Sequence, residues 1–277
     1  MTTLNLVGAG HVGRVLGRLF AAGGAFTVQD VLTRSAASSE AALAFIGAGH
    51  ACAAVEQMRP AGAWMLAVGD DAIGPACAAL VASQGERLAG ATVFHCSGAK
   101  ASGELAAARA AGAFVASVHP VRSFADPAAV AESFSGTWCG IEGDREALAV
   151  LEPGFEAIGA RLVRIDPAAK TVYHAAAVFA SNYLVTVLDA ALRAYEAAGV
   201  PPQVARELAR PLASEALDNV FRLGPEGALS GPVARGDFAT VARQQEAVAR
   251  WDLETGRFYE AMVAPTAALA RRKRKDA

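Results

Sequence analysis

The stretch GAGHVG, residues 8–13, decides the fold of this chain. A short apolar run, Leu4 to Val7, precedes it, and apolar residues recur with helical spacing after it. A G-x-G-x-x-G pattern between a strand and a helix is typical of a turn that binds a dinucleotide. Gly8 permits the tight turn, Gly10 lets the backbone approach a pyrophosphate, and Gly13 lets the helix pack against the strand.

The helix after this turn is expected to begin at His11 and Val12. Its first N–H groups carry a positive partial charge toward bound phosphates, so both residues are predicted to lie at the cofactor. We interpret His11 as a solvent-facing residue of the loop rather than as a catalyst. A glycine-rich turn in a protein that binds no nucleotide is the alternative interpretation.

Strand-like and helix-like segments alternate through the first half of the chain. Apolar runs at 26–32, 63–71, 91–98 and 113–120 are separated by helical patterns, and a last pair of strands is expected within 137–144 and 160–166. This rhythm predicts an α/β fold with a doubly wound, mostly parallel Rossmann sheet.

The pattern becomes helical at about Pro167. One long helix is expected over 168–198, a second over 204–223, and further helix over 238–270 that Pro265 kinks or divides, with LSGPVARGD (229–237) as a loop. We therefore predict two domains, a Rossmann dinucleotide-binding domain over 1–166 and an all-α domain over 167–277. The all-α domain is predicted to serve the substrate and to form a homodimer.

The composition argues against several other classes of protein. A net charge of −2 gives no indication of a nucleic-acid partner, and four cysteines without a C-x-x-C pair are typical of reduced thiols rather than of disulfides or a metal site. We expect no apolar segment to reach the ~18 uncharged residues of a membrane span, so we predict a cytoplasmic protein without a membrane partner. The run RRKRK at 271–275 is typical of a solvated chain end.

Thr33, Arg34 and Ser35 occupy the end of the second strand, where an acidic residue would select NAD. Asp30 lies inside the strand, too early to reach the ribose. A guanidinium and a hydroxyl suit a 2′-phosphate, so we predict NADP rather than NAD. The alternative is that Arg34 is only a surface residue at the start of a helix.

Three later strands end in polar residues at the edge where ligands of open α/β sheets bind. One ends at Gly69 and Asp70, which are predicted to lie beside the cofactor, although Asp70 also suits a helix N-cap. The next ends at His95 and Ser97. Ser97 is either a cap or a hydrogen-bond partner of the substrate, and His95 is predicted to bind the substrate.

His119 ends the third of these strands, in the segment SVHPVRSF (117–124). Pro120 holds His119 in extended backbone and so fixes the direction of its side chain. An imidazole suits the proton transfer that accompanies a hydride. His119 is therefore the candidate acid or base, with a structural role at the turn as the alternative, and Arg122 is the candidate for binding an anion.

One face of the expected long helix carries polar residues. Lys170, His174 and Ser181 share that face, with Asn182 beside it. We predict that His174, Ser181 and Asn182 line the substrate side of a cleft, and ordinary interhelical hydrogen bonds remain the alternative.

The motifs GAGHVG, FHCSGAK, VHPVRSF, KTVYHAAAVFASNYL and LSGPVARGD together resemble a family of uncharacterised proteins. Members carry a Rossmann-like NADP-binding domain and a helical domain of unknown function with a 6-phosphogluconate-dehydrogenase-type fold. Ser97 and His119 are similar to a serine and histidine that act on the substrate hydroxyl in prephenate dehydrogenases, but VRSF departs from the glycine-rich continuation there. The architecture is also similar to that of pyrroline-5-carboxylate reductases.

The resemblance implies an NADP-dependent oxidoreductase that transfers a hydride between NADP(H) and a small polar or anionic metabolite. His119 would be the acid or base, and Ser97 would polarise the reacting oxygen. A dinucleotide-binding sensor or scaffold dimer without turnover is the alternative.

Overall fold

The computed structural model describes residues 1–273, so the last two residues of RRKRK, Arg274 and Lys275, lie outside the described residues. The chain forms two compact units, residues 1–180 and 181–277. The predicted boundary after residue 166 follows the last strand, whereas the compact units divide later, inside the helical run that begins there.

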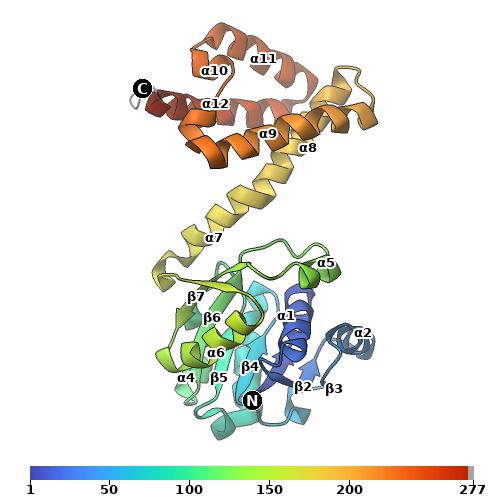
Figure 1. Cartoon of the computed structure of the whole chain (residues 1–277), viewed down its shortest axis with the longest axis vertical. Helices are drawn as coiled ribbons and strands as arrows, with labels where there is room; N and C mark the ends of the chain where they lie inside the picture. The colour runs from blue at the N-terminus through green and yellow to red at the C-terminus, as the bar shows by residue number, and fades with distance from the viewer. Residues whose placement is uncertain (274–277) are drawn as a thin grey trace. The chain divides into compact units, whose positions relative to one another are not determined.

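The first unit contains an eight-stranded sheet in the order β3-β2-β1-β4-β5-β6-β7-β8 (Figure 1). All neighbouring strands are parallel except β6 and β7, which are antiparallel. This confirms the predicted doubly wound, mostly parallel Rossmann sheet. The strands are β1 (Thr3–Val7), β2 (Thr27–Leu32), β3 (His50–Cys52), β4 (Ala63–Leu66), β5 (Thr92–His95), β6 (Phe114–Pro120), β7 (Trp138–Gly143) and β8 (Arg161–Arg164).

Helices cover both faces of this sheet. One face carries α1 (His11–Ala22), α2 (Ala36–Ile46), α5 (Pro127–Glu132) and α6 (Arg145–Ala157), and the other carries α3 (Ile73–Gln84) and α4 (Ala106–Ala110). Successive strand residues point to opposite faces, so Met65 belongs to the first core cluster while its neighbours Trp64 and Leu66 belong to the second.

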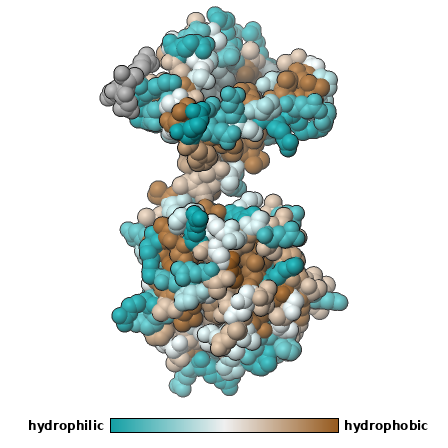
Figure 2. Space-filling model, viewed as in Figure 1, coloured by the Kyte–Doolittle hydropathy of each residue, from teal (hydrophilic) through white to brown (hydrophobic). Residues whose placement is uncertain are grey.

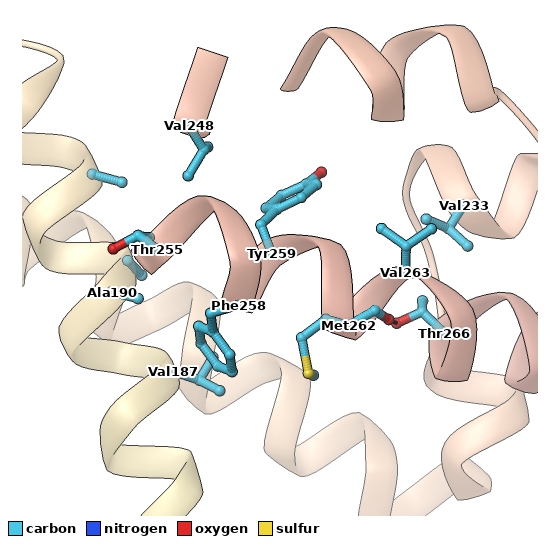
Figure 3. Close-up of a pocket in the computed structure, with 12 residues that line it drawn as sticks. Val187, Ala190, Val233, Val248, Thr255, Phe258, Tyr259, Met262, Val263 and Thr266 are labelled. Atoms are coloured by element: carbon cyan, nitrogen blue, oxygen red, sulfur yellow. Dashed lines mark hydrogen bonds between the residues drawn. The ribbon is translucent and has the colours of Figure 1, made fainter. Parts of the chain in front are cut away.

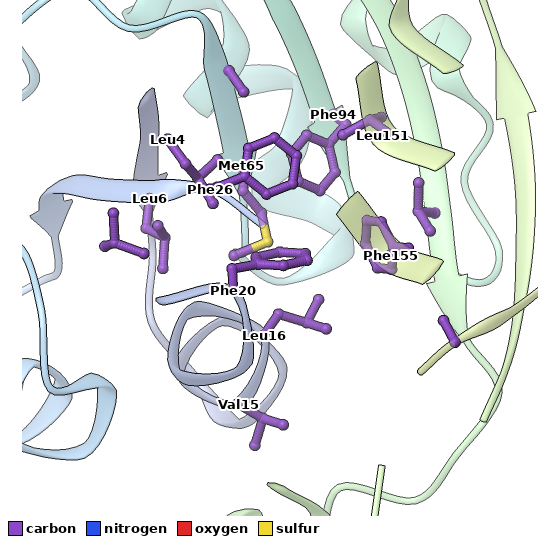
Figure 4. Packing of buried hydrophobic residues seen from close by; sticks show 14 of the residues in the cluster. Leu4, Leu6, Val15, Leu16, Phe20, Phe26, Met65, Phe94, Leu151 and Phe155 are labelled. Atoms are coloured by element: carbon purple, nitrogen blue, oxygen red, sulfur yellow. The ribbon is translucent and has the colours of Figure 1, made fainter. Parts of the chain in front are cut away.

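Aromatic rings fill the first core cluster (Figure 4). The rings of Phe20 and Phe26 lie 5.0 Å apart, those of Phe20 and Phe155 lie 5.1 Å apart, and all three are almost fully buried. Both pairs are edge-to-face, the arrangement that the ring quadrupoles favour. This packing fixes α1 and α6 on the sheet and thereby holds the glycine turn at the end of β1.

The predicted helix over 168–198 is interrupted. It consists of a 3-10 turn (Pro167–Ala169), α7 (Lys170–Val178), a π-helical turn (Phe179–Tyr183) and α8 (Leu184–Ala197). The remaining helices of the second unit are α9 (Pro202–Ala228), α10 (Pro232–Arg235), α11 (Phe238–Trp251) and α12 (Leu253–Lys273).

The breaks in these later helices differ from the expected ones. The predicted loop 229–237 contains α10, and α11 and α12 are separated at Asp252, which has extended backbone, whereas Pro265 lies inside α12. Within α9 the helical backbone is broken at Gly224, whose φ of 74° favours glycine.

The helical run Pro167–Ala197 is long and apolar enough to cross a membrane, judged by length and composition alone. The expectation that no segment reaches this length is therefore wrong. A single helix of this kind is a weak argument for a membrane span, because core helices of water-soluble proteins pass the same test. Apolar residues lie exposed along it, among them Val172, Phe179 and Val185 (Figure 2). The absence of a membrane partner stays a prediction.

Candidate functional site

The glycine turn between β1 and α1 has the geometry that the motif predicts. Gly8 has φ +89°, and a Cβ there would lie 2.5 Å from the carbonyl oxygen of Ala67. A Cβ at Gly13 would lie 2.7 Å from the Cβ of Ala67, so both glycines are required by the packing of the turn. A Cβ at Gly10 would meet nothing within 4 Å. Gly10 therefore leaves open space beside the N terminus of α1, where a phosphate would bind.

A cavity of about 490 Å³ opens at this turn. Among the described residues, those lining it include the guanidinium groups of Arg14 and Arg34 and no carboxylate. Arg34 is exposed, and Arg14 donates to the carbonyl of Ala9 over 3.3 Å. Sequence reasoning missed Arg14, although its place one turn into α1 puts it beside the glycine turn. A cavity with this lining suits a nucleotide that carries an extra phosphate.

The neighbouring residues of the second strand have local structural partners. Ser35 caps α2 by accepting from the backbone N–H of Ser38, and Thr33 bonds the hydroxyl of Ser39 at 2.8 Å. Asp30 is buried and pairs with Arg59 at 2.6 Å, so it cannot serve a ribose. The hydrogen bonds with Arg59 hold the pKa of Asp30 below its usual value although burial, the largest influence, opposes them.

A second cavity of about 420 Å³ lies along the same edge of the sheet. It shares Gly10 and Gly69 with the first, and the predicted site residues on its lining are His11, Val12, Gly13, Asp70, Ser97, His119, Arg122 and His174. The carboxyl ends of β1, β4, β5 and β6 thus bring the glycine turn and His119 to one cavity.

His119 is half-buried at the end of β6, and its Nδ1 lies 3.0 Å from the hydroxyl of Tyr173. The rings of Tyr173 and His174 each have their centroid 5.6 Å from that of His119. Burial lowers the pKa of His119 to about 4, with smaller contributions from Lys170 and His174, while Asp70 opposes them. His119 is therefore neutral at pH 7.

Gly98 lets the two histidines approach this closely. A Cβ at position 98 would lie 2.8 Å from the His119 ring and closer still to Nδ1 of His174. The Nδ1 of His174 is buried and has no hydrogen-bond partner among the described residues. The two imidazoles are therefore packed against a residue without a side chain on the wall of the cavity.

Ser97 and His95 organise the loop after β5. Ser97 Oγ accepts from the N–H groups of Ala99 and Lys100 at 3.2 and 3.0 Å, which supports the capping interpretation. His95 is fully buried, its Nδ1 accepts from the Ser97 N–H, and its Nε2 lies 3.1 Å from the carbonyl of Ala101. Burial lowers its pKa to about 4. His95 does not line the cavity, which corrects its predicted contact with the substrate.

Arg122, although on the cavity lining, is engaged elsewhere. Its guanidinium donates to the carbonyl of Ser133 and, over 2.6 Å, to the Ser133 hydroxyl at the end of α5. These bonds orient the guanidinium, and the binding of an anion by Arg122 stays a prediction.

Two other predicted residues are placed at the cavity. His11 Nδ1 lies 2.7 Å from the carbonyl of Phe124 and so ties the glycine turn to the segment after β6. Asp70 lies in the first turn of a 3-10 helix capped by Gly69, and its side chain makes no capping hydrogen bond. The N-cap interpretation of Asp70 is therefore wrong, and its carboxylate stays at the cavity.

The first turn of α7 supplies two residues that the sequence reasoning did not place in the site. Lys170 is almost fully buried, and its Nζ donates to the carbonyl of Ser97 at 2.9 Å and to Ser117 Oγ at 2.8 Å. Burial lowers its pKa. Tyr173 contacts His119. The spacing i, i+3, i+4 of Lys170, Tyr173 and His174 was the available signal for this shared face.

Ser181 and Asn182 belong to the second unit, on the exposed π-helical turn, where the Ser181 hydroxyl donates to Asn182 Oδ1 at 2.9 Å. Their contact with a substrate stays a prediction.

The second unit has a cavity of its own, of about 430 Å³, between α8, α10, α11 and α12 (Figure 3). Phe258, Met262 and Val187 point into it. Its lining is apolar apart from Thr255, Tyr259 and Thr266, and the Tyr259 hydroxyl is already bonded to Gln244. This lining does not suit phosphates or proton transfer, so the candidate site is the cavity of the first unit.

Residues 137–266 match the family model of a domain of unknown function, DUF2520. This part of the chain is similar to the DUF2520 family. The matched part begins at β7, so it includes the last two strands of the sheet as well as the helices up to α12. The match confirms the predicted resemblance to Rossmann-like proteins with a domain of unknown function. No protein of curated function matches the chain in sequence.

Solved structures match nearly the whole chain, including the part similar to the DUF2520 family. Protein TM1727 from Thermotoga maritima is 26% identical with a TM-score of 0.74, over 98% of this chain and 99% of that one. A "putative NADP oxidoreductase" from Bacteroides fragilis is 20% identical with a TM-score of 0.78, over 96% and 98%. An imine reductase from Myxococcus stipitatus in complex with NADP+ is 17% identical with a TM-score of 0.65, over 99% and 95%. Pyrroline carboxylate reductases also match. These likenesses establish the fold.

Proposed function

We propose that this protein is an NADP-dependent oxidoreductase that transfers a hydride between NADP(H) and a small polar metabolite. The observation that carries the proposal is the edge of the sheet, where the glycine turn and His119 line one continuous pair of cavities. The names of the similar structures support it, since two of them bind NADP or are described as NADP oxidoreductases.

The residues present fit NADP. The open face of Gly10 and the N terminus of α1 would hold the pyrophosphate, and Arg34 with Arg14 would hold the 2′-phosphate. Ser35 would add a hydroxyl next to Arg34. When bound, NADPH supplies a hydride to the substrate.

His119 would serve the atom of the substrate that gains electron density as the hydride arrives. Its neutral imidazole can donate a hydrogen bond to that atom or hold the proton that the product needs. Ser97, whose hydroxyl oxygen already caps its loop, can still donate its own proton toward the cavity. The name of the imine reductase makes a C=N bond a candidate for reduction beside a C=O bond.

Calorimetric titration with NADPH and NADH tests the cofactor. We expect NADPH to bind more tightly, and Arg34→Ala to weaken NADPH binding about 10- to 100-fold, as the loss of a hydrogen bond to a charged group does, while NADH binding changes little. Arg18→Ala is the matched control, because Arg18 is an exposed residue of α1 outside the cavity. Absence of binding by both nucleotides would rule the proposal out.

A metabolite screen for NADPH oxidation then tests turnover. With a substrate in hand, His119→Gln should lower turnover by about 10²–10⁴, the usual contribution of an acid or base. Binding without any turnover would favour a dinucleotide sensor instead. We also propose a cytoplasmic protein that works as a homodimer through its helical unit.

A further inference from the structure

We propose that Tyr173 fixes the tautomer of His119, so that the imidazole presents its Nε2–H to the cavity as a hydrogen-bond donor to the substrate. This inference deepens the proposed function and rests on the role given there to His119. It names Tyr173 as a positioning residue.

The hydroxyl of Tyr173 lies close to His119 and to Gly140. It lies 3.0 Å from Nδ1 of His119, and it packs over Gly140, the residue paired with His119 across β6 and β7. Burial raises the pKa of Tyr173 to about 12, so the hydroxyl keeps its proton at pH 7.

Gly140 is needed for this arrangement. A Cβ at position 140 would lie 2.7 Å from Cζ of Tyr173 and would push the phenol away from the strand. The absence of a side chain on β7 therefore places the Tyr173 hydroxyl within reach of His119.

The proton of the Tyr173 hydroxyl has one hydrogen-bond acceptor within reach. The hydrogen bonds of the described residues offer it no acceptor other than Nδ1 of His119. A neutral imidazole has one N–H and one lone pair, so a ring that accepts at Nδ1 carries its proton on Nε2.

The Nε2 atom faces the side of the ring where Gly98 lines the cavity. A Cβ on Gly98 would lie 2.8 Å from it, so only the missing side chain keeps that nitrogen accessible. The other groups around the ring leave it neutral: Lys170 and His174 lower its pKa, and Asp70 raises it. Lys170 Nζ itself is bonded to Ser97 and Ser117, not to the ring.

A fixed Nε2–H selects the chemistry of the substrate. The atom it meets must accept a hydrogen bond, as a carbonyl oxygen or the lone pair of an unprotonated imine does. A protonated iminium or an ammonium group in that place would point its own N–H donor at the Nε2–H donor, so no hydrogen bond could form. The inferred substrate therefore reacts through an uncharged aldehyde, ketone or imine group.

Nitrogen NMR of the histidine rings in the free protein tests the inference without a substrate or NADP. The His119 signals are assigned by their loss in His119→Gln, which serves only for assignment. At pH 7 we expect Nε2 to be protonated and Nδ1 to be an unprotonated acceptor. A proton on Nδ1 of the wild-type ring would overturn the inference.

Tyr173→Phe provides the second measurement. Loss of the hydroxyl should move the Nδ1 signal and populate the Nδ1–H form, whereas the control Tyr259→Phe, which removes a hydroxyl bonded to Gln244, should leave His119 unchanged. An unchanged Nδ1 signal in Tyr173→Phe would also overturn it. Because NADPH binding is measured separately, a wrong tautomer with intact binding would refute this inference and leave the proposed function standing.

Discussion

The two units of the chain bury apolar side chains to very different extents. In the first unit, large side chains such as Trp64, Phe20 and Phe155 are at most 1% exposed. In the described part of the second unit the buried apolar residues are only Ala205, Val241 and Ala270, while Phe221 is 87% and Leu212 is 63% exposed. A sheet wrapped by its own crossover helices completes its core alone, whereas the described helices of the second unit leave large apolar side chains uncovered.

The largest expected effect is in the core of the first unit. Phe155→Ala should lower the free energy of unfolding by about 3–5 kcal/mol, because it removes a buried ring that touches two other aromatic rings. Urea unfolding followed by tryptophan fluorescence measures this. Phe221→Ala is the control and should leave the unfolding of the first unit unchanged; equal losses in the two variants would abolish the contrast between the units.

The exposed helical surface leads to the second prediction. We expect a dimer by light scattering, and we expect Leu212→Asp with Phe221→Asp to convert it to a monomer, because charges would enter the apolar surface. Val163→Asp, at a 40% exposed position of the first unit, should keep the dimer mass. A wild-type monomer at high concentration would show that the second unit needs no partner copy.

The third prediction concerns acid, which should destabilise the first unit more than the second. Burial lowers the pKa values of His95 and His119 from the ordinary 6.5 to about 4. Between pH 4 and 6.5 the unfolded chain binds more protons than the folded chain. The free energy of unfolding is therefore highest above pH 6.5 and decreases as the pH falls to 4. The loss should be roughly 2–3 kcal/mol per histidine.

Urea unfolding at a series of pH values measures this loss. His95→Gln should flatten the pH dependence below pH 6.5, whereas the exposed His50→Gln should not. A stability that stays constant from pH 6.5 to 4 would contradict the neutral burial of both histidines.

The fourth prediction separates the folding and binding roles of the glycine turn. Gly8→Ala forces a side chain into left-handed backbone against Ala67, so it should cost at least about 1–2 kcal/mol of stability. Gly10→Ala meets open space and should leave the melting temperature unchanged but weaken NADPH binding. Equal stability losses in the two variants would mean that Gly10 is also structural.

The smallest expected effect is electrostatic. Lys170→Met should raise the pKa of His119 from about 4 toward its ordinary value, because Lys170 contributes to lowering it. Titration of the His119 ring by NMR measures the change, and Lys100→Met, an exposed residue paired with Glu104, is the control. An unchanged pKa of His119 in Lys170→Met would show that Lys170 does not lower the pKa of His119.

The fold could be predicted from the sequence because its signals are local. The strand, glycine turn and helix over residues 3–22 follow from spacing alone, and the ends of β4, β5 and β6 followed from the alternation of elements. The glycine turn and His119 could be placed on one edge for the same reason.

The side-chain partners could not be predicted, because they depend on contacts between distant segments. The guanidinium of Arg122 is bonded at the end of α5, and both nitrogens of His95 are satisfied within its own loop. Tyr173 reaches His119 only because Gly140, on another strand, leaves room for its ring. No periodicity in the sequence records such contacts.

The central claim is that NADP and His119 share one cavity, and the ring signals of His119 and His174 during an NADPH titration test it most directly. The account predicts that both rings shift as NADPH binds to the wild-type chain, and that Gly10→Ala requires more NADPH for the same shift. Saturating NADPH that leaves both rings unchanged would contradict it.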